Sequence, residues 1–317
     1  MTKTALLLTL LVAALVCALN AIPAQAQPIR VFVALTGNDS NPCTFASPCK
    51  SVQHAHDVVA AAGEVRMLDP GSYGLLTITK SISILGDGHG GIAAQSGSTA
   101  ITINAGASDK INLRGLVIEG FSTGASGIVF NGGASLNIQN CLIRNFFNIG
   151  IAFRPAASIQ SQFHVSDTVV SDNNGPGILI QPINASAVKV GVALIRVQTE
   201  NNQYGVRVDT SGVTSMGTSF STMTDVTISD STIAGNSTGV GASATNTSGF
   251  ALLFIKNSLI IHNGTGFAYT GNSAIELTHS NLTNNDVGWS GTLNTTGDNV
   301  IQNANDNVLP VLPFALR

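Results

Sequence analysis

The chain alternates apolar and polar residues in short runs that repeat along most of its length. Residues 135–153, SLNIQNCLIRNFFNIGIAF, show the unit clearly: an alternating strand, a polar turn with Asn, and a Gly that opens a second strand. Alternation with period two predicts half-buried β-strands, and Gly, Asn, Ser and Thr between the runs predict turns. This Gly recurs 22 to 34 residues apart, at Gly150, Gly177, Gly205, Gly239, Gly266 and Gly288. An internal repeat of this length predicts a solenoid.

The apolar positions of the repeat indicate which solenoid to expect. They are mostly Ile, Val and Leu at period two, whereas a leucine-rich repeat needs Leu at fixed spacings. Strands that repeat without helices between them predict an all-β parallel β-helix of about 8–10 coils. An Asn lies in the turn ahead of each Gly, and six in register predict a ladder along the axis: Asn145, Asn173, Asn201, Asn236, Asn263 and Asn284. For any single copy, an ordinary solvated turn is the alternative.

The first 26 residues have the pattern of a secretory signal peptide. Lys3 supplies the positive charge, residues 5–19 the apolar core, and residues 24–26, Ala-Gln-Ala, the cleavage site. The apolar core is too short for a membrane span, and the residues before Cys17 fit a lipoprotein signal poorly. We therefore expect a secreted or periplasmic protein with no membrane span after cleavage.

The mature chain divides into three parts. Residues 27–63 are expected to form an N-terminal segment and cap helix, 64–303 the parallel β-helix, and 304–317 a C-terminal tail with two prolines. The long spacing between two of the repeat glycines indicates an inserted loop at 209–222. Inserted loops on one face of a solenoid often build a binding wall, although a tolerated surface loop explains the spacing equally well.

The N-terminal segment combines a predicted disulfide with a predicted helix. Cys43 and Cys49 lie in NPCTFASPCK, and in an exported protein this pair predicts a small disulfide loop. Ser47 is expected to cap the helix, Pro48 to occupy its first position, and Gly63 to end it. Because the end of a β-helix exposes unpaired backbone groups, this helix is predicted to cover it.

Two stretches resemble a known family. GEVRMLDPGSYG (63–74) and TITKSISILGDG (77–88), followed by INLRGLVIEG (111–120), resemble the first coils of right-handed parallel β-helix proteins of the pectin-lyase-like superfamily. The resemblance covers about residues 29–303 and is closest to small exported bacterial β-helix repeat proteins. It implies the fold and a possible polysaccharide partner, but the superfamily includes lyases, hydrolases, epimerases, adhesins and non-enzymes.

The catalytic motifs of that superfamily are missing. The resemblance implies, for a lyase, an Asp/Glu cluster that holds calcium and an Arg or Lys base, and for a galacturonan hydrolase the motifs N-T-D, D-D, H-G and R-I-K. The chain has none of these except His89-Gly90, in a glycine-rich corner. We predict no metal site, and calcium only if the protein is a lyase.

Alignment of the coils gives one candidate cluster. It places Glu119 beside Arg144 on neighbouring coils, with Arg114 nearby on an outward position. These three residues are the candidates for substrate binding, and no catalytic residue is assigned. A surface ion pair, which contributes about 0–1 kcal/mol, is the alternative for the same residues. His164, His262 and His279 are isolated on strands or turns, and we expect them to point outward or to have hydrogen-bond partners rather than to be catalytic.

Charge and motifs together bound the function. Only 10% of residues are charged, the net charge is −3, and no cluster of Lys and Arg occurs, which argues against a nucleic-acid partner. The first hypothesis is an exported β-helix protein that binds carbohydrate or has a structural role at the cell envelope, without catalysis. The alternative is a polysaccharide lyase or glycoside hydrolase that acts on acidic, uronate-type polysaccharide. The sequence makes no prediction of oligomeric state.

Overall fold

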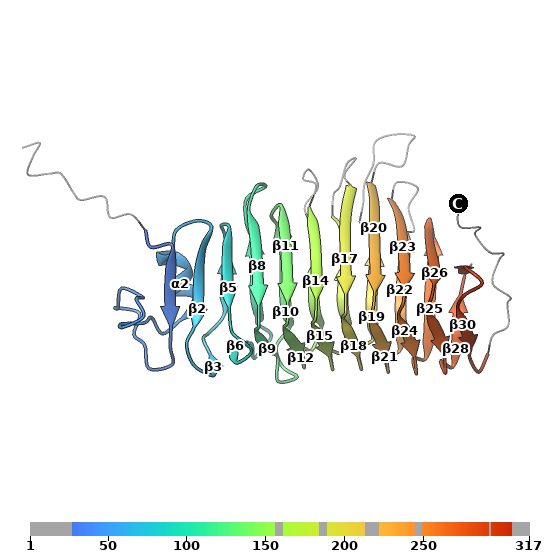
Figure 1. The fold of residues 1–317 in the computed structure, drawn as a ribbon, viewed down its shortest axis with the longest axis horizontal. Coiled ribbons are helices and arrows are strands. Elements are labelled where there is room, and N and C mark those ends of the chain that lie inside the picture. Colours follow the sequence, from blue (N-terminus) through green and yellow to red (C-terminus); the bar gives the residue numbers. More distant parts are fainter. Residues whose placement is uncertain are drawn as a thin grey trace, which may run out of the picture.

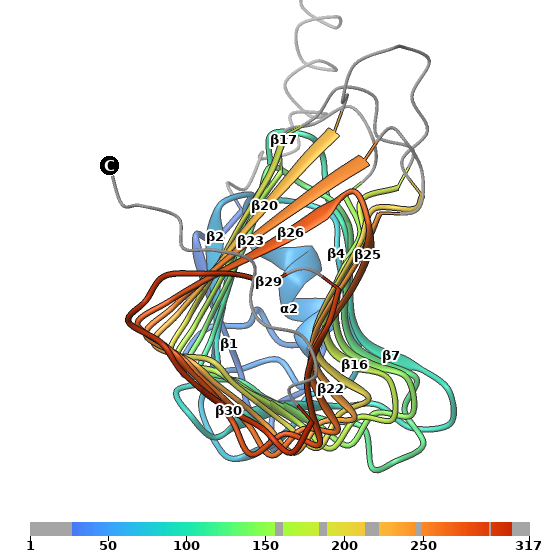
Figure 2. The ribbon, with the colours of Figure 1, turned by 90° about the vertical axis from the view of Figure 1, so that its right-hand side faces the viewer.

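The computed structural model describes residues 27–155, 161–183, 189–212, 222–244, 249–291 and 293–305. In these ranges the chain winds through three parallel sheets in turn, A, B and C, for nine complete coils. Figure 1 shows the resulting elongated molecule, and Figure 2 shows the coils superposed in a view along the axis. The predicted signal peptide (1–26), most of the inserted loop (213–221) and nearly all of the tail (306–317) lie outside the described residues.

Each sheet contains one strand from nearly every coil, and all pairings are parallel. The strands of sheet A are β1 (Arg30–Val33), β2 (Gly63–Met67), β5 (Ile82–Leu85), β8 (Lys110–Arg114), β11 (Ser135–Gln139), β14 (Gln162–Ser166), β17 (Lys189–Ile195), β20 (Thr222–Ser229), β23 (Gly249–Lys256), β26 (Ser273–Thr278) and β29 (Leu293–Thr295). The strands of sheet B are β3 (Gly71–Ser72), β6 (Gly90–Ala93), β9 (Val117–Glu119), β12 (Leu142–Arg144), β15 (Val169–Ser171), β18 (Gln198–Glu200), β21 (Thr232–Ala234), β24 (Leu259–Ile261), β27 (Asn281–Thr283) and β30 (Val300–Gln302). The strands of sheet C are β4 (Leu76–Ile78), β7 (Thr99–Asn104), β10 (Ser126–Gly132), β13 (Ile149–Phe153), β16 (Pro176–Ile180), β19 (Tyr204–Asp209), β22 (Thr238–Ala244), β25 (Thr265–Gly271) and β28 (Val287–Ser290).

The core lies inside the tube and consists of stacked apolar columns. Ile151, Ile178 and Val206 are direct neighbours on β13, β16 and β19, and each is at most 1% exposed. Phe153 stacks between Phe130 and Phe163, with 4.6 Å between the centres of each ring pair. The inward register expected from the alternation is therefore confirmed, because each coil places the same kind of residue at the same interior position.

Two adjacent columns of residues lie at the corner between sheets B and C. The ladder predicted from the sequence combined members of both columns. The first column has left-handed backbone, with φ between 54° and 66°, and consists of Asn145, Asp172, Asn201, Gly235, His262 and Asn284. The second column points inward and forms the hydrogen-bonded ladder: Asn173, Asn202, Asn236, Asn263, Asn285 and Asn303. The prediction is correct for three members of the ladder and wrong for Asn145, Asn201 and Asn284.

A second polar column lies at the corner between sheets A and B. Cys141 occupies the position filled by Thr168, Ser231 and Ser258 in other coils. Its side chain is 4% exposed, and its backbone N–H donates to the Thr168 hydroxyl. Each hydroxyl in this column accepts from the backbone of the preceding coil, which satisfies buried amides at the bend.

The cap helix is present, but it begins later than predicted. Within the described residues the one helix is α2 (Val52–Val58), which lies across the N-terminal end of the tube (Figure 2). Ser51, and not Ser47, is its N-cap, because the disulfide between Cys43 and Cys49 and the pairing of Cys49 with Val33 hold the preceding residues outside the helix. The disulfide is confirmed. Gly63 starts β2 and does not end the helix.

Candidate functional site

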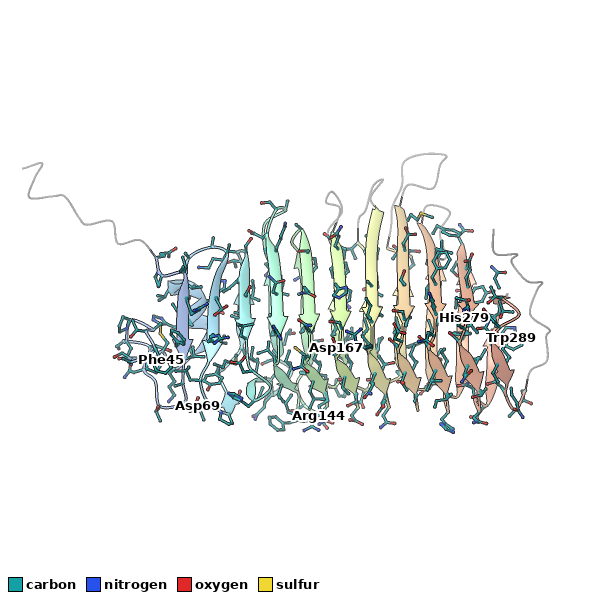
Figure 3. All side chains as sticks on the ribbon, in the orientation of Figure 1. Phe45, Asp69, Arg144, Asp167, His279 and Trp289 are labelled. Carbon is teal, nitrogen blue, oxygen red and sulfur yellow. A yellow bond between two sulfur atoms is a disulfide. The ribbon has the colours of Figure 1, made fainter. Side chains whose placement is uncertain are left out.

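The predicted pair of Glu119 and Arg144 lies on sheet B. The two residues are neighbours on β9 and β12, and Arg144 Nε donates to Glu119 Oε2 at 2.8 Å. Glu119 Oε1 accepts from Asn145 Nδ2 at 2.8 Å and from the Phe121 backbone N–H at 3.2 Å. Glu119 is 9% exposed, and both oxygens of its carboxylate accept hydrogen bonds from protein donors. Figure 3 shows Arg144 at the edge of the molecule, away from the broad face of sheet A.

Arg114 lies on another face. It ends β8 in sheet A, opposite Gln139, and is exposed. Within the described ranges no hydrogen bond or ion pair joins Arg114 to Glu119 or Arg144. The structure thus brings together two of the three candidate residues, and the substrate-binding role of the three stays a prediction.

A hollow of about 560 Å³ lies on the outer face of sheet A, over β11, β14 and β17. Its lining includes Ser135, Asn137, Gln162, His164, Gly191 and Ala193. Along the sheet, His164 has Asn137 on one side and Ala193 on the other, and Gln162 lies next to Gly191. A Cβ on Gly191 meets no atom within 4 Å, so the small residues of β17 leave open space beside the polar side chains of β11 and β14.

One polar atom in the lining of this hollow lacks a hydrogen-bond partner. Asn137 Oδ1 is shielded from solvent and accepts no hydrogen bond. A buried acceptor without a partner costs about 1–3 kcal/mol. The lining residues include no carboxylate.

An ion pair lies at the foot of the strand that carries His164. Arg196 Nε donates to Asp167 Oδ1 at 2.6 Å, and this hydrogen bond, with a smaller contribution from His164, lowers the pKa of Asp167. Figure 3 shows Asp167 at the corner between sheets A and B. The pair is exposed and belongs to the corner, not to the hollow.

No group of three carboxylates converges within the part of the chain that the structure describes. The one set of three potential metal ligands there is Cys43, Cys49 and His54, whose atoms lie within 4.8 Å of one another. The two sulfurs are bonded to each other, so this set reflects the disulfide. Across the same residues, no helix is long and apolar enough to cross a membrane.

The fold relates the chain to known structures, although its sequence does not. No family model and no curated protein matches it. Among solved structures, pectate lyase Pel9A has a TM-score of 0.53 at 14% identity, over 90% of this chain and 78% of that one. XylC in complex with xylose has a TM-score of 0.55 at 8% identity, over 85% and 67%. ORF18 of Geobacillus virus E2 has a TM-score of 0.50 at 13% identity, over 86% and 60%.

These comparisons show the fold alone. The chain is a right-handed parallel β-helix, the fold that it shares with pectate lyase Pel9A and other carbohydrate-active enzymes. At identities this low, what those proteins bind or cleave does not transfer to this chain.

Sequence reasoning missed the amides and small residues of the hollow on sheet A and placed only His164, as an outward residue. The pairing of His164 with Ala193 depends on the register between coils. Once the apolar columns are aligned, the small outward residues of β17 are the signal that reveals the hollow.

Proposed function

We propose that this protein binds carbohydrate, without cleaving it, through the hollow on the outer face of sheet A. One observation supports this proposal. The side chains of Asn137, Gln162 and His164 line the hollow beside the open space at Gly191 and Ala193. Amide and imidazole groups both donate and accept hydrogen bonds, as the hydroxyl groups of a sugar require. A volume of about 560 Å³ is within the range of small-molecule sites.

Export is part of the proposal. The N-terminal 26 residues have the pattern of a signal peptide, and the disulfide between Cys43 and Cys49 suits an oxidising compartment. A secreted or periplasmic protein meets polysaccharides of the cell surface or the surroundings. This supports a carbohydrate ligand over an intracellular one.

The lining of the hollow favours binding over catalysis. Glycoside hydrolysis generally uses a pair of carboxylates, and the lining of the hollow offers amides and an imidazole instead. The alternative of an acidic-polysaccharide lyase or hydrolase therefore needs catalytic groups other than the lining residues. Binding and product formation by the mature protein distinguish the two possibilities.

The test uses the mature protein, residues 27–317, with a panel of neutral and acidic polysaccharides, with and without calcium. We expect binding in calorimetry, and we expect Asn137→Ala and His164→Ala to weaken it about two- to tenfold each, the loss of one or two hydrogen bonds. Asn294→Ala is the matched control, because Asn294 is an amide in the same outward column, on β29. We expect it to bind like the wild type.

Three results contradict the proposal. One is that the wild type binds no polysaccharide of the panel. Another is an equal loss of affinity in Asn294→Ala and Asn137→Ala. New reducing ends or unsaturated uronate products contradict the absence of cleavage and favour the lyase or hydrolase.

A further inference from the structure

A second hollow, of about 460 Å³, lies on the outer face of sheet C, beside the corner with sheet B. It spans β10, β13 and β16, so it is separate from the hollow on sheet A. Its lining includes one cation, one aromatic ring, three amides and a hydroxyl: Arg154, Phe147, Asn148, Asn174, Gln203 and Ser126. None of these residues belongs to the cluster predicted from the sequence.

Arg154 differs from most other arginines of the chain. Among the seven arginines in the described residues, five have a carboxylate within 4 Å: Arg30, Arg66, Arg144, Arg196 and Arg207. Arg114 has none but is exposed to water. Arg154 has none either, and its Nε is buried without a hydrogen-bond partner. A half-buried guanidinium without a counter-charge is the feature that an anionic ligand would complete.

The aromatic ring beside Arg154 is held by a rigid turn. Phe147 is 58% exposed, while its backbone N–H donates to Gly124 O at 2.8 Å. The backbone N–H of the next residue, Asn148, donates to Ala125 O at 3.0 Å. Glu119 binds Arg144 and Asn145 at the start of this turn, so the predicted pair acts as a support for it. The backbone is fixed and the side chains of Phe147 and Asn148 face outward.

The amides come from three successive coils. Asn148, Asn174 and Gln203 are exposed, and within the described part of the chain their side chains make no hydrogen bond. Asn148, Gly175 and Gln203 are neighbours in register, and Asn174 lies one residue before Gly175, so the three amides lie close together at one corner of successive coils. Amides on successive coils, about 4.8 Å apart, can contact the hydroxyl groups of a ligand that extends along the tube.

We propose that the hollow on sheet C binds an anionic sugar residue, a uronate, within an acidic polysaccharide. Arg154 pairs with the carboxylate in the forked geometry that suits a guanidinium. Phe147 packs against the apolar face of the sugar ring, and the three amides bind its hydroxyls. This site does not depend on the hollow of sheet A, because no residue is common to both linings.

The test compares oligogalacturonates with their methyl esters. The free oligogalacturonates, called the acid form below, have ionised carboxylates at pH 7, whereas the esters contain the same sugars without this charge. We expect the mature protein to bind the acid form at pH 7 about ten- to a hundredfold more tightly than the ester, since a hydrogen bond to a charged group contributes about 1.5–3 kcal/mol. Arg154→Ala should lose that advantage and Arg154→Lys should keep part of it. Phe147→Ala should weaken both forms.

Two control variants distinguish a site at Arg154 from binding elsewhere on the protein. Arg114→Ala removes the other arginine that lacks a carboxylate partner and should bind the acid form like the wild type. Asn294→Ala alters the outer face of sheet A outside both hollows and should also leave this binding unchanged. Melting curves of each variant show that it is folded.

Several outcomes overturn the proposal. They are equal binding of the acid and the ester by the wild type, unchanged binding by folded Arg154→Ala, and an equal loss in Arg114→Ala. If Asn137→Ala alone removes the binding of the acid form, the uronate lies on sheet A, and the proposal for sheet C fails while the proposed function stands.

Discussion

Replacement of Asn236 by Ala should reveal how much the asparagine ladder stabilises the fold. Asn236 is 2% exposed, and its Nδ2 donates to Thr199 O at 3.0 Å, to Ala234 O at 3.1 Å and to Asn263 Oδ1 at 3.0 Å. Its Oδ1 accepts from the Asn202 backbone N–H at 2.9 Å. Alanine removes all of these bonds.

The magnitude follows from the groups that lose a partner. The buried N–H of Asn202 and the carbonyl of Thr199 each lose the Asn236 side chain. At about 1–3 kcal/mol for each unsatisfied buried group, Asn236→Ala should lower the free energy of unfolding by about 2–6 kcal/mol. That is a large part of the roughly 5–15 kcal/mol that stabilises a typical domain.

Asn201→Gly is the matched control. Asn201 precedes a ladder residue, is exposed, and has φ of 55°, a conformation that glycine adopts without strain. The substitution removes only the exposed hydrogen bond to Asp172 Oδ1, at 3.1 Å. We expect a change below about 1 kcal/mol, within the range of surface substitutions.

The assay is urea unfolding followed by circular dichroism, combined with hydrogen exchange. Because each coil of a solenoid contacts only its neighbours, Asn236→Ala should lose protection first at β18, β21 and β24, where the ladder is interrupted. Equal urea midpoints for Asn236→Ala and Asn201→Gly would refute the assignment of the ladder to the inward column.

Three further predictions test the core, the thiol and the corner. Ile178→Asp places a carboxylate at a fully buried position and should unfold the protein. Thr227→Asp, on the outer face of β20, should leave the melting temperature nearly unchanged. Equal melting temperatures for the two variants would contradict the assignment of inward and outward positions. Burial raises the pKa of the Cys141 thiol to about 11, so iodoacetamide at pH 8 should label it only after unfolding, and labelling of the native protein speaks against this burial. The hydrogen bond from Arg196 lowers the pKa of Asp167 in the folded state. The Asp167 carboxylate therefore stabilises the fold at pH values above its unfolded pKa of about 3.9. This contribution disappears as the pH falls through the lower pKa of the folded state. Urea midpoints at pH 7 and pH 3 should therefore differ less in Asp167→Asn than in the wild type, and an identical difference contradicts the pairing.

The fold was predictable from the sequence because the interior obeys the same rule in every coil. Ile151, Ile178 and Val206 lie in one column, and the repeat glycines identify that column without any structure. The ladder was predictable only in part. In the adjacent pairs Asn201-Asn202 and Asn284-Asn285, both corner columns accept Asn, one for its left-handed backbone and one for its side-chain hydrogen bonds, so the pattern alone does not choose between them.

The start of the cap helix was missed for a different reason. Ser47 and Pro48 are good helix-starting residues, but they lie inside the loop closed by Cys43 and Cys49. Cys49 also pairs with Val33 in an extended bridge, which excludes a helical backbone at this point. A tertiary constraint therefore overrides a local preference, and Ser51 becomes the first residue free to cap the helix.

The candidate sites were the least predictable feature, and the reason lies in the architecture. Stacking requires similar residues at inward positions of successive coils, whereas outward positions have no such constraint. An outward residue therefore indicates a candidate site in two cases. Either it differs from its neighbours in the same column, or it lacks the interaction partner that residues of the same type have elsewhere in the chain. Gly191 and Ala193 are departures of the first kind, since they open the space beside His164. Arg154 is a departure of the second kind, because most arginines here have a carboxylate and it has none. Such departures depend on the lateral neighbours of a residue, which the register between coils determines. In a solenoid, the interior therefore indicates the fold, and the exceptions on the outer faces indicate the candidate ligand sites.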